Sequence, residues 1–353
     1  MPEFPFRRAF CLGRRSAAGI AAAAVAALAL TACGSDTGSK ADSSAPSSGS
    51  FEPVTIEHAF GKTEIQEKPT RVVTIGWGST DAMLALGVVP VGIEKQEYGG
   101  DANGVLPWVA DKLTELDAQT PTLLPSANSA DPAYEQILKL RPDLILAPYS
   151  GITEEQYGKL SKIADTVAYP KQPWSTTMEE IVTVTGRSLG LADEAERVLA
   201  DIDATVAKAK AEHPEFDGLT IATLAYGSNE LYTYTQADPR EQVLRDLGFE
   251  TAPSVLDLTK TADPGAFYVP FSFEQADRLT SDVLLTYSAS EDELEALEQN
   301  PGYRSMPQIE AGTVAKVVGE AEVAAVSPPT ALSVTWGLPE LVDALAEAAT
   351  SAS

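Results

Sequence analysis

The stretch Asp193–Glu212 is the feature that most constrains how this chain can fold. Gly190 precedes it, Pro214 ends it, and neither residue type interrupts it. Its apolar residues recur at helical spacing and form one stripe: Ala195, Val198, Leu199, Ile202, Val206 and Ala209. A helix of this length spans about 30 Å, the width of a small domain. We therefore expect a rigid helix between two lobes, with a surface helix of one large α/β domain as the alternative.

The N-terminus has the features of a bacterial lipoprotein signal. A cluster of arginines precedes the apolar run Ala17–Leu30, which is too short to span a membrane. Leu-Thr-Ala-Cys at 30–33, followed by glycine, looks like a lipobox, so Cys33 would be lipidated and become the first mature residue. A chance cysteine in an ordinary secretory signal is the alternative. Arg7 and Arg8 also resemble a twin-arginine export signal, which leaves the export route open.

The composition of residues 34–50 predicts a flexible tether, because this segment contains no large apolar residue. Ordered structure is expected from Phe51. The predicted division has five parts: a signal in residues 1–33, a tether in 34–50, an N-terminal lobe in 51–174, an inter-lobe segment with the long helix in 175–213, and a C-terminal lobe in 214–353.

The charge and the scarce cysteines and histidines exclude several functions. The formal net charge is −26, and removal of the signal, which carries +3, makes it −29. Such a surface will not bind nucleic acid or an anionic bilayer. The mature chain would keep Cys33 alone, so no disulfide can form. Only His58 and His213 are present, which argues against a His-rich metal site. His58 lies within a predicted strand, so we expect it to be structural.

Strand-like and helix-like runs alternate on both sides of the long helix, which favours parallel sheets covered by helices. Before the helix we expect a hairpin over Val54–Ile65, strands at Arg71–Ile75, Pro90–Ile93, Asp143–Ala147 and Val167–Tyr169, and helices at Ser79–Leu86, Tyr134–Leu140 and Thr153–Ile163. After it we expect strands at Thr220–Leu224, Asp282–Leu285 and Thr313–Val318, and helices at Arg240–Leu247, Phe273–Leu279 and Leu338–Ala349.

The two halves also repeat a local pattern. In each, an aromatic-Glu-Gln sequence opens a short helix, and the strand that follows starts at Asp and ends in Tyr-Ser. The first copy runs from Tyr134 to Ser150 and the second from Phe273 to Ser288. Matching patterns at corresponding places predict two lobes of the same architecture.

The sequence resembles the iron–siderophore substrate-binding lipoproteins of ABC importers over about Thr55–Leu345. The resemblance is carried by IEHAFGKTEIQEKPTRVVTIGWGSTDAMLALGVVPVGI, ILKLRPDLILAPYSGITEEQYGKLSKIADTVAY and DPREQVLRDLGF. It implies a class III periplasmic binding protein, in which a single long α-helix joins two Rossmann-like α/β lobes with mostly parallel sheets.

The resemblance also implies a function and its partners. The ligand would be a ferric siderophore, with iron as the only metal and no other cofactor; cobalamin and haem remain alternatives. The sequence does not distinguish hydroxamate, catecholate and carboxylate siderophores. An ABC permease would receive the ligand from a monomeric receptor. Cys33 would anchor this receptor to the extracytoplasmic face of the cell membrane.

Ligands of open parallel sheets bind beyond the carboxyl ends of the strands. Aromatic and hydroxyl side chains follow most of the predicted strands, and Trp336 lies before the last predicted helix. Such residues can form the walls of a ligand cleft, although ordinary packing is the alternative for each of them. The candidate ligand-binding residues on this basis are Trp77, Tyr149, Ser150, Tyr226, Tyr287 and Trp336.

Arg240 is one of few cations in this acidic chain, and the resemblance implies a position near the cleft. It would pair there with anionic siderophore oxygens. The alternative is a bridge to Asp238 or Glu241 in the first turn of a helix. Lys95 and Arg304 are weaker candidates for the same role. Trp108 and Trp174 belong either to the core or to the rim.

Glu135 and Glu274 hold the second position of the two aromatic-Glu-Gln helix starts. In related binding proteins a glutamate at each of these places pairs with permease arginines, so the resemblance implies that they dock the lobes on the permease. The alternative is a helix first-turn glutamate that complements the helix dipole.

The sequence contains none of the common nucleophile, zinc-protease or phosphate-binding motifs. Gly76-Trp77-Gly78 follows a predicted strand but lacks the rest of a dinucleotide-binding motif. We therefore expect a binding protein without catalytic activity, and a secreted hydrolase is the alternative from another class.

Overall fold

A computed structural model describes residues 51–126, 131–227, 230–260, 262–263 and 265–352 of the chain. These residues belong to one compact unit that spans Ser50–Ser353. The predicted signal, Cys33 and the predicted tether lie outside the described residues. In the part of the chain that is described, no helix is long and apolar enough to cross a membrane.

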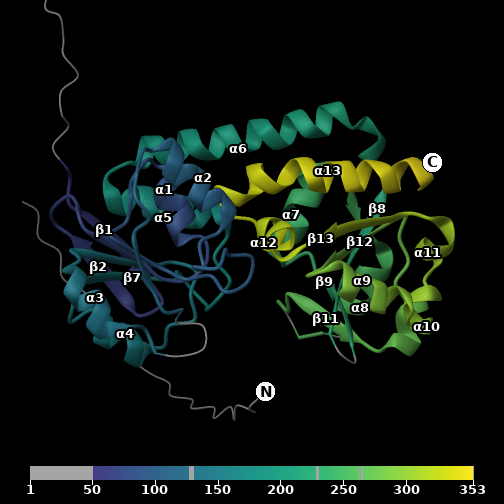
Figure 1. Cartoon of the computed structure of the whole chain (residues 1–353), viewed down its shortest axis with the longest axis horizontal. Coiled ribbons are helices and arrows are strands. Elements are labelled where there is room, and N and C mark those ends of the chain that lie inside the picture. The colour runs from purple at the N-terminus through teal and green to yellow at the C-terminus, as the bar shows by residue number, and fades with distance from the viewer. Residues whose placement is uncertain (1–50, 127–130, 228–229, 261, 264, 353) are drawn as a thin grey trace, which may run out of the picture. The chain divides into compact units, whose positions relative to one another are not determined.

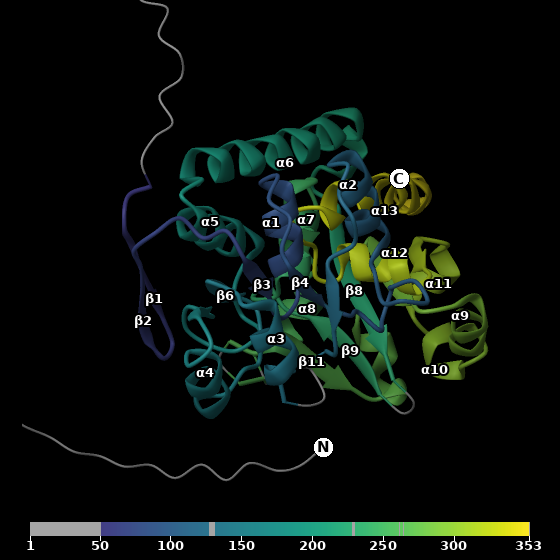
Figure 2. The same cartoon turned by 60° about the vertical axis from the view of Figure 1, so that its left-hand side comes forward.

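A parallel five-stranded sheet forms the centre of the first lobe. Its strand order is β5 (Thr122–Leu124), β4 (Gly92–Glu94), β3 (Val72–Thr74), β6 (Leu144–Ala147) and β7 (Asp165–Ala168). One face packs against α1 (Ser79–Ala85), α2 (Pro107–Glu115) and α5 (Met178–Leu189). The other face packs against α3 (Tyr134–Leu140) and α4 (Glu154–Leu160), which lie away from α6 in Figures 1 and 2. The predicted hairpin is confirmed as β1 (Val54–His58) and β2 (Gly61–Ile65).

The second lobe contains a sheet with the order β11 (Tyr268–Phe271), β9 (Leu231–Tyr234), β8 (Thr220–Tyr226), β12 (Val283–Ser288) and β13 (Val314–Val318), while β10 (Glu250–Thr251) also pairs with β8. The β8, β10, β12 and β13 pairings are parallel, and β9 and β11 add an antiparallel edge. One face packs against α7 (Pro239–Asp246), α12 (Glu320–Val326) and α13 (Ser333–Ala352). The other packs against α8 (Pro253–Thr259), the 3-10 helix η2 (Phe273–Arg278), α9 (Glu291–Glu298), α10 (Pro301–Arg304) and α11 (Pro307–Ala311).

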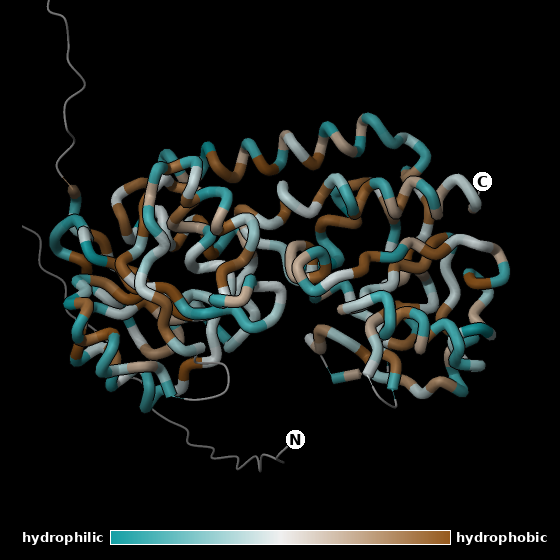
Figure 3. Tube along the Cα trace, in the orientation of Figure 1, coloured by the Kyte–Doolittle hydropathy of each residue, from teal (hydrophilic) through white to brown (hydrophobic). Residues whose placement is uncertain are grey.

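The long helix is confirmed as α6 (Ala192–Glu212), which joins the two lobes (Figure 1). Hydrophobic and hydrophilic residues alternate along it (Figure 3), and Ala195, Ile202 and Val206 are buried. It packs against α5 of the first lobe and against α7 and α13 of the second. Gly186 allows the contact with α5, because a Cβ atom there would lie only 2.6 Å from that of Ala195. The predicted fold class is therefore confirmed, whereas the exact domain limits stay predictions.

The repeated Asp of the two halves has the same structural role in both lobes. In the first lobe, the Asp143 carboxylate accepts hydrogen bonds from Thr70 N and Thr70 Oγ1, both at 2.8 Å. In the second, the Asp282 carboxylate accepts them from Thr220 N at 2.8 Å and Thr220 Oγ1 at 2.7 Å. Each Asp thus ties the start of one central strand to its parallel neighbour, β6 to β3 and β12 to β8.

The lobes also contact each other through the segment between α12 and α13. Trp77 Nε1 of the first lobe donates to the carbonyl oxygen of Pro328 at 3.0 Å, and Thr330 Oγ1 donates to the carboxylate of Asp81 in α1. A single hydrophobic cluster continues from the helices of the first lobe into those of the second. The lobes are therefore held by α6 and by this second contact.

The largest error in a predicted helix boundary is at the start of the last helix. The last helix begins at Ser333, not at Leu338, so Trp336 lies in its first turns and not in a loop. Thr330 and Ser333 start this helix early by exchanging hydrogen bonds between each backbone N–H and the other side chain, at 2.8 and 3.2 Å. The predicted helix placed Pro339 in its first turn, whereas the earlier start at Ser333 puts Pro339 inside the helix.

Candidate functional site

Two turns at the carboxyl ends of β3 and β6 bring Trp77 and Tyr149 together. Gly76 has φ of 84°, and a Cβ atom there would lie 2.1 Å from the Tyr149 carbonyl oxygen, so only glycine fits. The same carbonyl accepts a hydrogen bond from Trp77 N at 3.1 Å. Tyr149 packs edge-on against Trp174 at 5.6 Å between ring centroids. The first lobe thus presents adjacent aromatic residues at its strand ends, as predicted.

Trp77 also lines a pocket of about 400 Å³ that both lobes form, which we call the strand-end pocket. The first lobe contributes Trp77, Gln96, Glu97, Tyr98 and Ser126, and the second contributes Ala324, Ser327 and Pro328. Its lining is thus aromatic and polar, with a carboxylate from Glu97.

The second lobe carries a wall of tyrosines at the strand ends of β8, β9 and β12, and none of these is among the described residues that line the strand-end pocket. Tyr226 shares a hydrogen bond of 2.7 Å between its hydroxyl oxygen and Ser288 Oγ. Tyr287 is buried, with its ring 6.4 Å from that of Tyr234. Burial raises the pKa of Tyr226 and Tyr287, so both phenols are protonated at neutral pH.

Arg240 lies where the two walls meet. Its Nε donates to Ser327 Oγ at 2.7 Å, and Ser327 lines the strand-end pocket. Its guanidinium lies over the Tyr234 ring, 4.4 Å from the centroid. Burial raises the pKa of Tyr149, whereas the positive charge of Arg240 lowers it. The Tyr149 phenol of the first lobe and the Arg240 guanidinium of the second lobe therefore interact electrostatically.

Both interpretations of Arg240 are compatible with this geometry. Its Nη1 donates to Asp238 Oδ2 at 2.6 Å, as expected for a first-turn ion pair. A guanidinium has more donors than the bonds to Asp238 and Ser327 use, so others remain for a ligand. The role of Arg240 in ligand binding stays a prediction.

The remaining predicted residues lie deeper or further away. Ser150 is buried, and its hydroxyl donates to the Ala147 carbonyl oxygen at 2.9 Å. Trp336 packs against the buried Trp108 at 5.5 Å, within the contact between the lobes. Lys95 is exposed, and Arg304 is exposed on α10. His58 is buried and hydrogen-bonded to Thr63 Oγ1 at 2.9 Å.

The sequence interpretation missed Tyr98 and Tyr234. Tyr98 follows β4 in a glycine-rich loop and remains 44% exposed in the strand-end pocket. Burial and the charges of Glu320 and Glu293 raise its pKa to about 12. Tyr234 ends β9, whose residues alternate between buried and half-buried. This period of two in Leu-Tyr-Thr-Tyr was the signal that could have identified β9 and placed Tyr232 and Tyr234 on one face.

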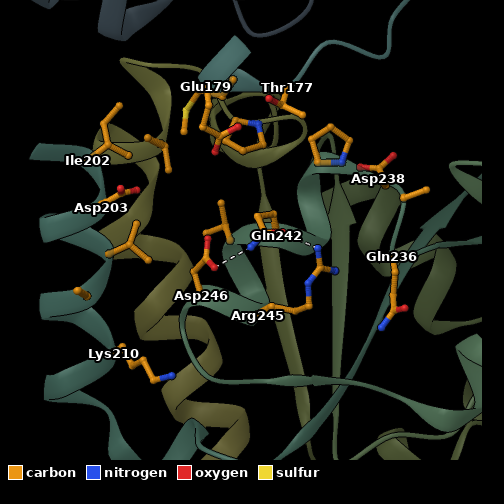
Figure 4. A pocket seen from close by; sticks show the side chains of 18 of the residues that line it. Thr177, Glu179, Ile202, Asp203, Lys210, Gln236, Asp238, Gln242, Arg245 and Asp246 are labelled. Atoms are coloured by element: carbon orange, nitrogen blue, oxygen red, sulfur yellow. Dashed lines mark hydrogen bonds between the residues drawn. The ribbon is translucent and has the colours of Figure 1, made fainter. Parts of the chain in front are cut away.

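A larger pocket of about 900 Å³ lies between α6, the start of α5 and α7 (Figure 4). Figure 4 shows Asp203 and Lys210 of α6 on one side and Arg245 and Asp246 of α7 on the other. None of the predicted ligand-binding residues is among the described residues that line it. We place the candidate site at the strand ends, because both lobes present aromatic side chains there, close to Arg240. The volume of a pocket does not by itself identify a binding site.

The predicted docking glutamates are both exposed. Glu135 is the second residue of α3, and Glu274 is the second residue of η2. The hydrogen bond with Ser272 is the main cause that lowers the pKa of Glu274. Both side chains are therefore accessible at equivalent places in the two lobes, and their contact with a permease stays a prediction.

Glu241 is a buried carboxyl group behind the wall of the second lobe. It is 1% exposed in the first turn of α7, and Thr223 Oγ1 donates to its Oε1 at 2.8 Å. Its pKa is raised to about 7, mainly by burial and also by the charge of Asp238, against the lowering effects of Thr223, Arg245 and Arg240. The charge of this carboxylate in turn raises the pKa of Tyr287.

Comparison with known proteins identifies the family of this chain. Residues 72–318 match the sequence profile named Periplasmic binding protein. The chain belongs to the periplasmic binding protein family. A solved structure of PiaA from Streptococcus pneumoniae in complex with ferrichrome has 34% sequence identity and a TM-score of 0.75, and the match covers 85% of this chain and 99% of that one.

Two Bacillus subtilis proteins are also similar to this member of the family. The probable siderophore-binding lipoprotein YfiY is 28% identical over 271 residues, which cover 75% of this chain and 77% of YfiY. The Fe(3+)-citrate-binding protein YfmC is 25% identical over 263 residues, which cover 73% of this chain and 76% of YfmC. The similarity therefore extends over both lobes.

The Glu241→Gln variant should change how stability depends on pH. The pKa of Glu241 in the folded protein, about 7, exceeds its ordinary value of 4.5, so the protonated carboxyl stabilises the fold below about pH 4.5. That stability is lost as the pH rises through about 7. Because glutamine is uncharged, the variant should be more stable than the natural protein at pH 8, on the order of 2 kcal/mol. Thermal unfolding from pH 5 to 8 measures this.

The exposed Glu250 provides the matched control, since Glu250→Gln removes a solvated charge and should leave the pH profile unchanged. Parallel profiles for Glu241→Gln and the natural protein would show that Glu241 does not titrate with a raised pKa.

Proposed function

We propose that this protein is an extracytoplasmic receptor that binds a ferric siderophore between its two lobes and delivers it to an ABC importer. The observation that carries the proposal is a pocket that both lobes form, with Trp77 and Tyr98 in its lining and Arg240 bonded to its Ser327. Membership of the periplasmic binding protein family supports a binding function. PiaA in its ferrichrome complex and the siderophore-binding relatives support the ligand class.

The aromatic walls suit a ferric siderophore for physical reasons. A siderophore encloses iron in an organic shell, so it offers apolar edges to aromatic rings and oxygens to hydrogen-bond donors. Trp77 and Tyr149 present rings from the first lobe, and the protonated phenol of Tyr98 presents a donor. A ligand that touches both walls would favour their approach.

Membrane attachment through Cys33 belongs to the same proposal, supported by the lipobox and by the lipoprotein relatives. Replacing the thiol removes the group that carries the lipid. The Cys33→Ala variant should therefore move from the membrane fraction to the soluble fraction or the medium. Cys11→Ala is the matched control, because Cys11 lies within the signal itself, and this variant should stay membrane-bound. Equal retention of Cys33→Ala in the membrane would refute lipidation there.

Tyr149→Ala should weaken ferric-siderophore binding by more than about 1 kcal/mol, as for an aromatic residue at a binding contact. Quenching of intrinsic fluorescence measures this with ferrichrome, and cobalamin and haem test the other ligands of such receptors. Trp77→Ala should weaken binding as well, with some loss of stability because Trp77 also packs against Trp108.

Tyr157→Ala is the control for Tyr149→Ala, since Tyr157 lies on α4 and packs against His58 and Phe60. Its affinity should match that of the natural protein. Unchanged affinity in Tyr149→Ala, together with a large fall in melting temperature, would make Tyr149 a core residue and not a ligand contact.

The double variant Glu135→Arg, Glu274→Arg should reduce iron uptake while ligand affinity and melting temperature stay unchanged. Both side chains are exposed, so charge reversal removes attraction to a permease without disturbing the fold. The double variant Glu196→Arg, Glu347→Arg makes the same charge change on α6 and α13 and should transport normally. Normal uptake by the first variant would refute the docking role.

A further inference from the structure

We propose that the strand-end pocket selects ferric siderophores without net negative charge, and so favours trihydroxamate complexes over tris-catecholate and citrate chelates. The inference rests on the proposed function, because it names the ligand class of the same site. The charges and hydrogen-bond donors in and around the pocket carry it.

The cation at the pocket is already compensated. Asp238 is 3% exposed and caps α7; its Oδ1 accepts a hydrogen bond from Arg240 N at 2.9 Å, and its Oδ2 accepts one from Arg240 Nη1 at 2.6 Å. The pair therefore contributes no net charge. An anionic ligand would have to compete with a carboxylate that two bonds hold in place. A neutral ligand needs only the guanidinium donors that the pair leaves unused.

The other charges around the pocket are negative. Glu97 lines it, and Glu320 Oε2 accepts a hydrogen bond from Gly99 N at 3.3 Å, which connects the lobes beside Tyr98. The charge of Glu293, in the first turn of α9, raises the pKa of both Tyr98 and Tyr226. Among the described residues that line the pocket there is no lysine or arginine, and Lys95, before the Tyr98 loop, is not one of them.

Tyr98, the tyrosine among the described residues that line the pocket, is a neutral donor. Burial and the two glutamates raise the pKa of Tyr98 to about 12, so its phenol keeps its proton. Tyr226 has no proton to offer a ligand, because Ser288 Oγ donates to the Ser290 carbonyl oxygen and therefore accepts from Tyr226. Protonated phenols donate to hydroxamate oxygens, and the aromatic rings contact an uncharged ligand shell.

These features disfavour a strongly anionic complex. Such a ligand would lose hydration on entering the site, and the nearby carboxylates would repel it. A neutral or cationic complex does not incur the repulsion. The discrimination should therefore decrease at high ionic strength, because exposed charges are screened over about 10 Å at 0.1 M salt.

The test measures affinities for four ferric complexes: neutral ferrichrome, cationic ferrioxamine B, anionic ferric enterobactin and anionic ferric citrate. Ferrichrome or ferrioxamine B should bind at least about tenfold more tightly than either anionic complex at low salt. The variant Glu293→Gln, Glu320→Gln keeps one acceptor oxygen on each side chain and removes both charges. It should bind the anionic complexes at least about threefold more tightly, ferrioxamine B more weakly and ferrichrome unchanged.

The control Glu196→Gln, Glu347→Gln removes the same net charge on exposed helix positions and should leave all four affinities unchanged. Tight binding of ferric enterobactin or ferric citrate at the level of the best hydroxamate would overturn the inference and leave the proposed function intact. Equal effects of the two double variants would also overturn it. Binding of none of the four complexes would instead refute the proposed function.

Discussion

The contact between the lobes depends on one buried carboxylate. Asp81 is 2% exposed in α1, and it accepts hydrogen bonds from Trp108 Nε1 at 2.6 Å and from Thr330 Oγ1. Burial raises the pKa of Asp81, whereas the bonds from Thr330 and Trp108 lower it. Removal of either donor would leave a buried carboxylate with less compensation. This arrangement fixes the segment before α13 against the first lobe.

That contact also shapes the ligand site. The Trp108 ring lies between those of Trp77 and Trp336, with centroid distances of 6.4 Å to Trp77 and 5.5 Å to Trp336. The three indoles therefore form a continuous row from the core to the strand-end pocket. Pro328 accepts the Trp77 hydrogen bond and also lines the pocket. The site is therefore assembled on a packed junction and on α6. A ligand meets walls whose positions the core already restricts, which reduces the entropy lost on binding.

Much of the fold could be predicted from the sequence, because the parallel strands are short buried apolar runs. Tyr134–Leu140 was predicted at its observed limits, and α6 differs by one residue. The helix α5 was not predicted, although Thr177 and Glu180 form a capping box at its start. The sequence Ile-Val-Thr-Val-Thr within it favours a strand, because its residues are β-branched. The helix is stabilised instead by the burial of Ile181, Val182 and Leu189 against neighbouring elements.

The site could be predicted only in part. Trp77 and Tyr149 could be predicted as site residues, because they come directly after central strands and ligands of parallel sheets bind beyond the carboxyl ends of the strands. Tyr234 depends on the antiparallel strand β9, and Tyr98 depends on a loop whose Gly99 packs against Ala324 of the other lobe. Ser150 follows a strand as well, but its hydroxyl donates a hydrogen bond to the Ala147 carbonyl oxygen of the same strand. Strand ends identify the edge of the sheet, whereas side-chain direction depends on contacts that the sequence does not display.

The internal repeat explains why the two lobes present matching surfaces. Asp143 and Asp282 fix the same pair of central strands in each sheet, and the elements before them carry Glu135 and Glu274. The repeat is not exact, because α3 is an α-helix and η2 is a 3-10 helix with a tighter turn. Ser272 also holds Glu274 locally and lowers its pKa. The two glutamates are therefore equivalent in chain order and exposure but differ in local geometry.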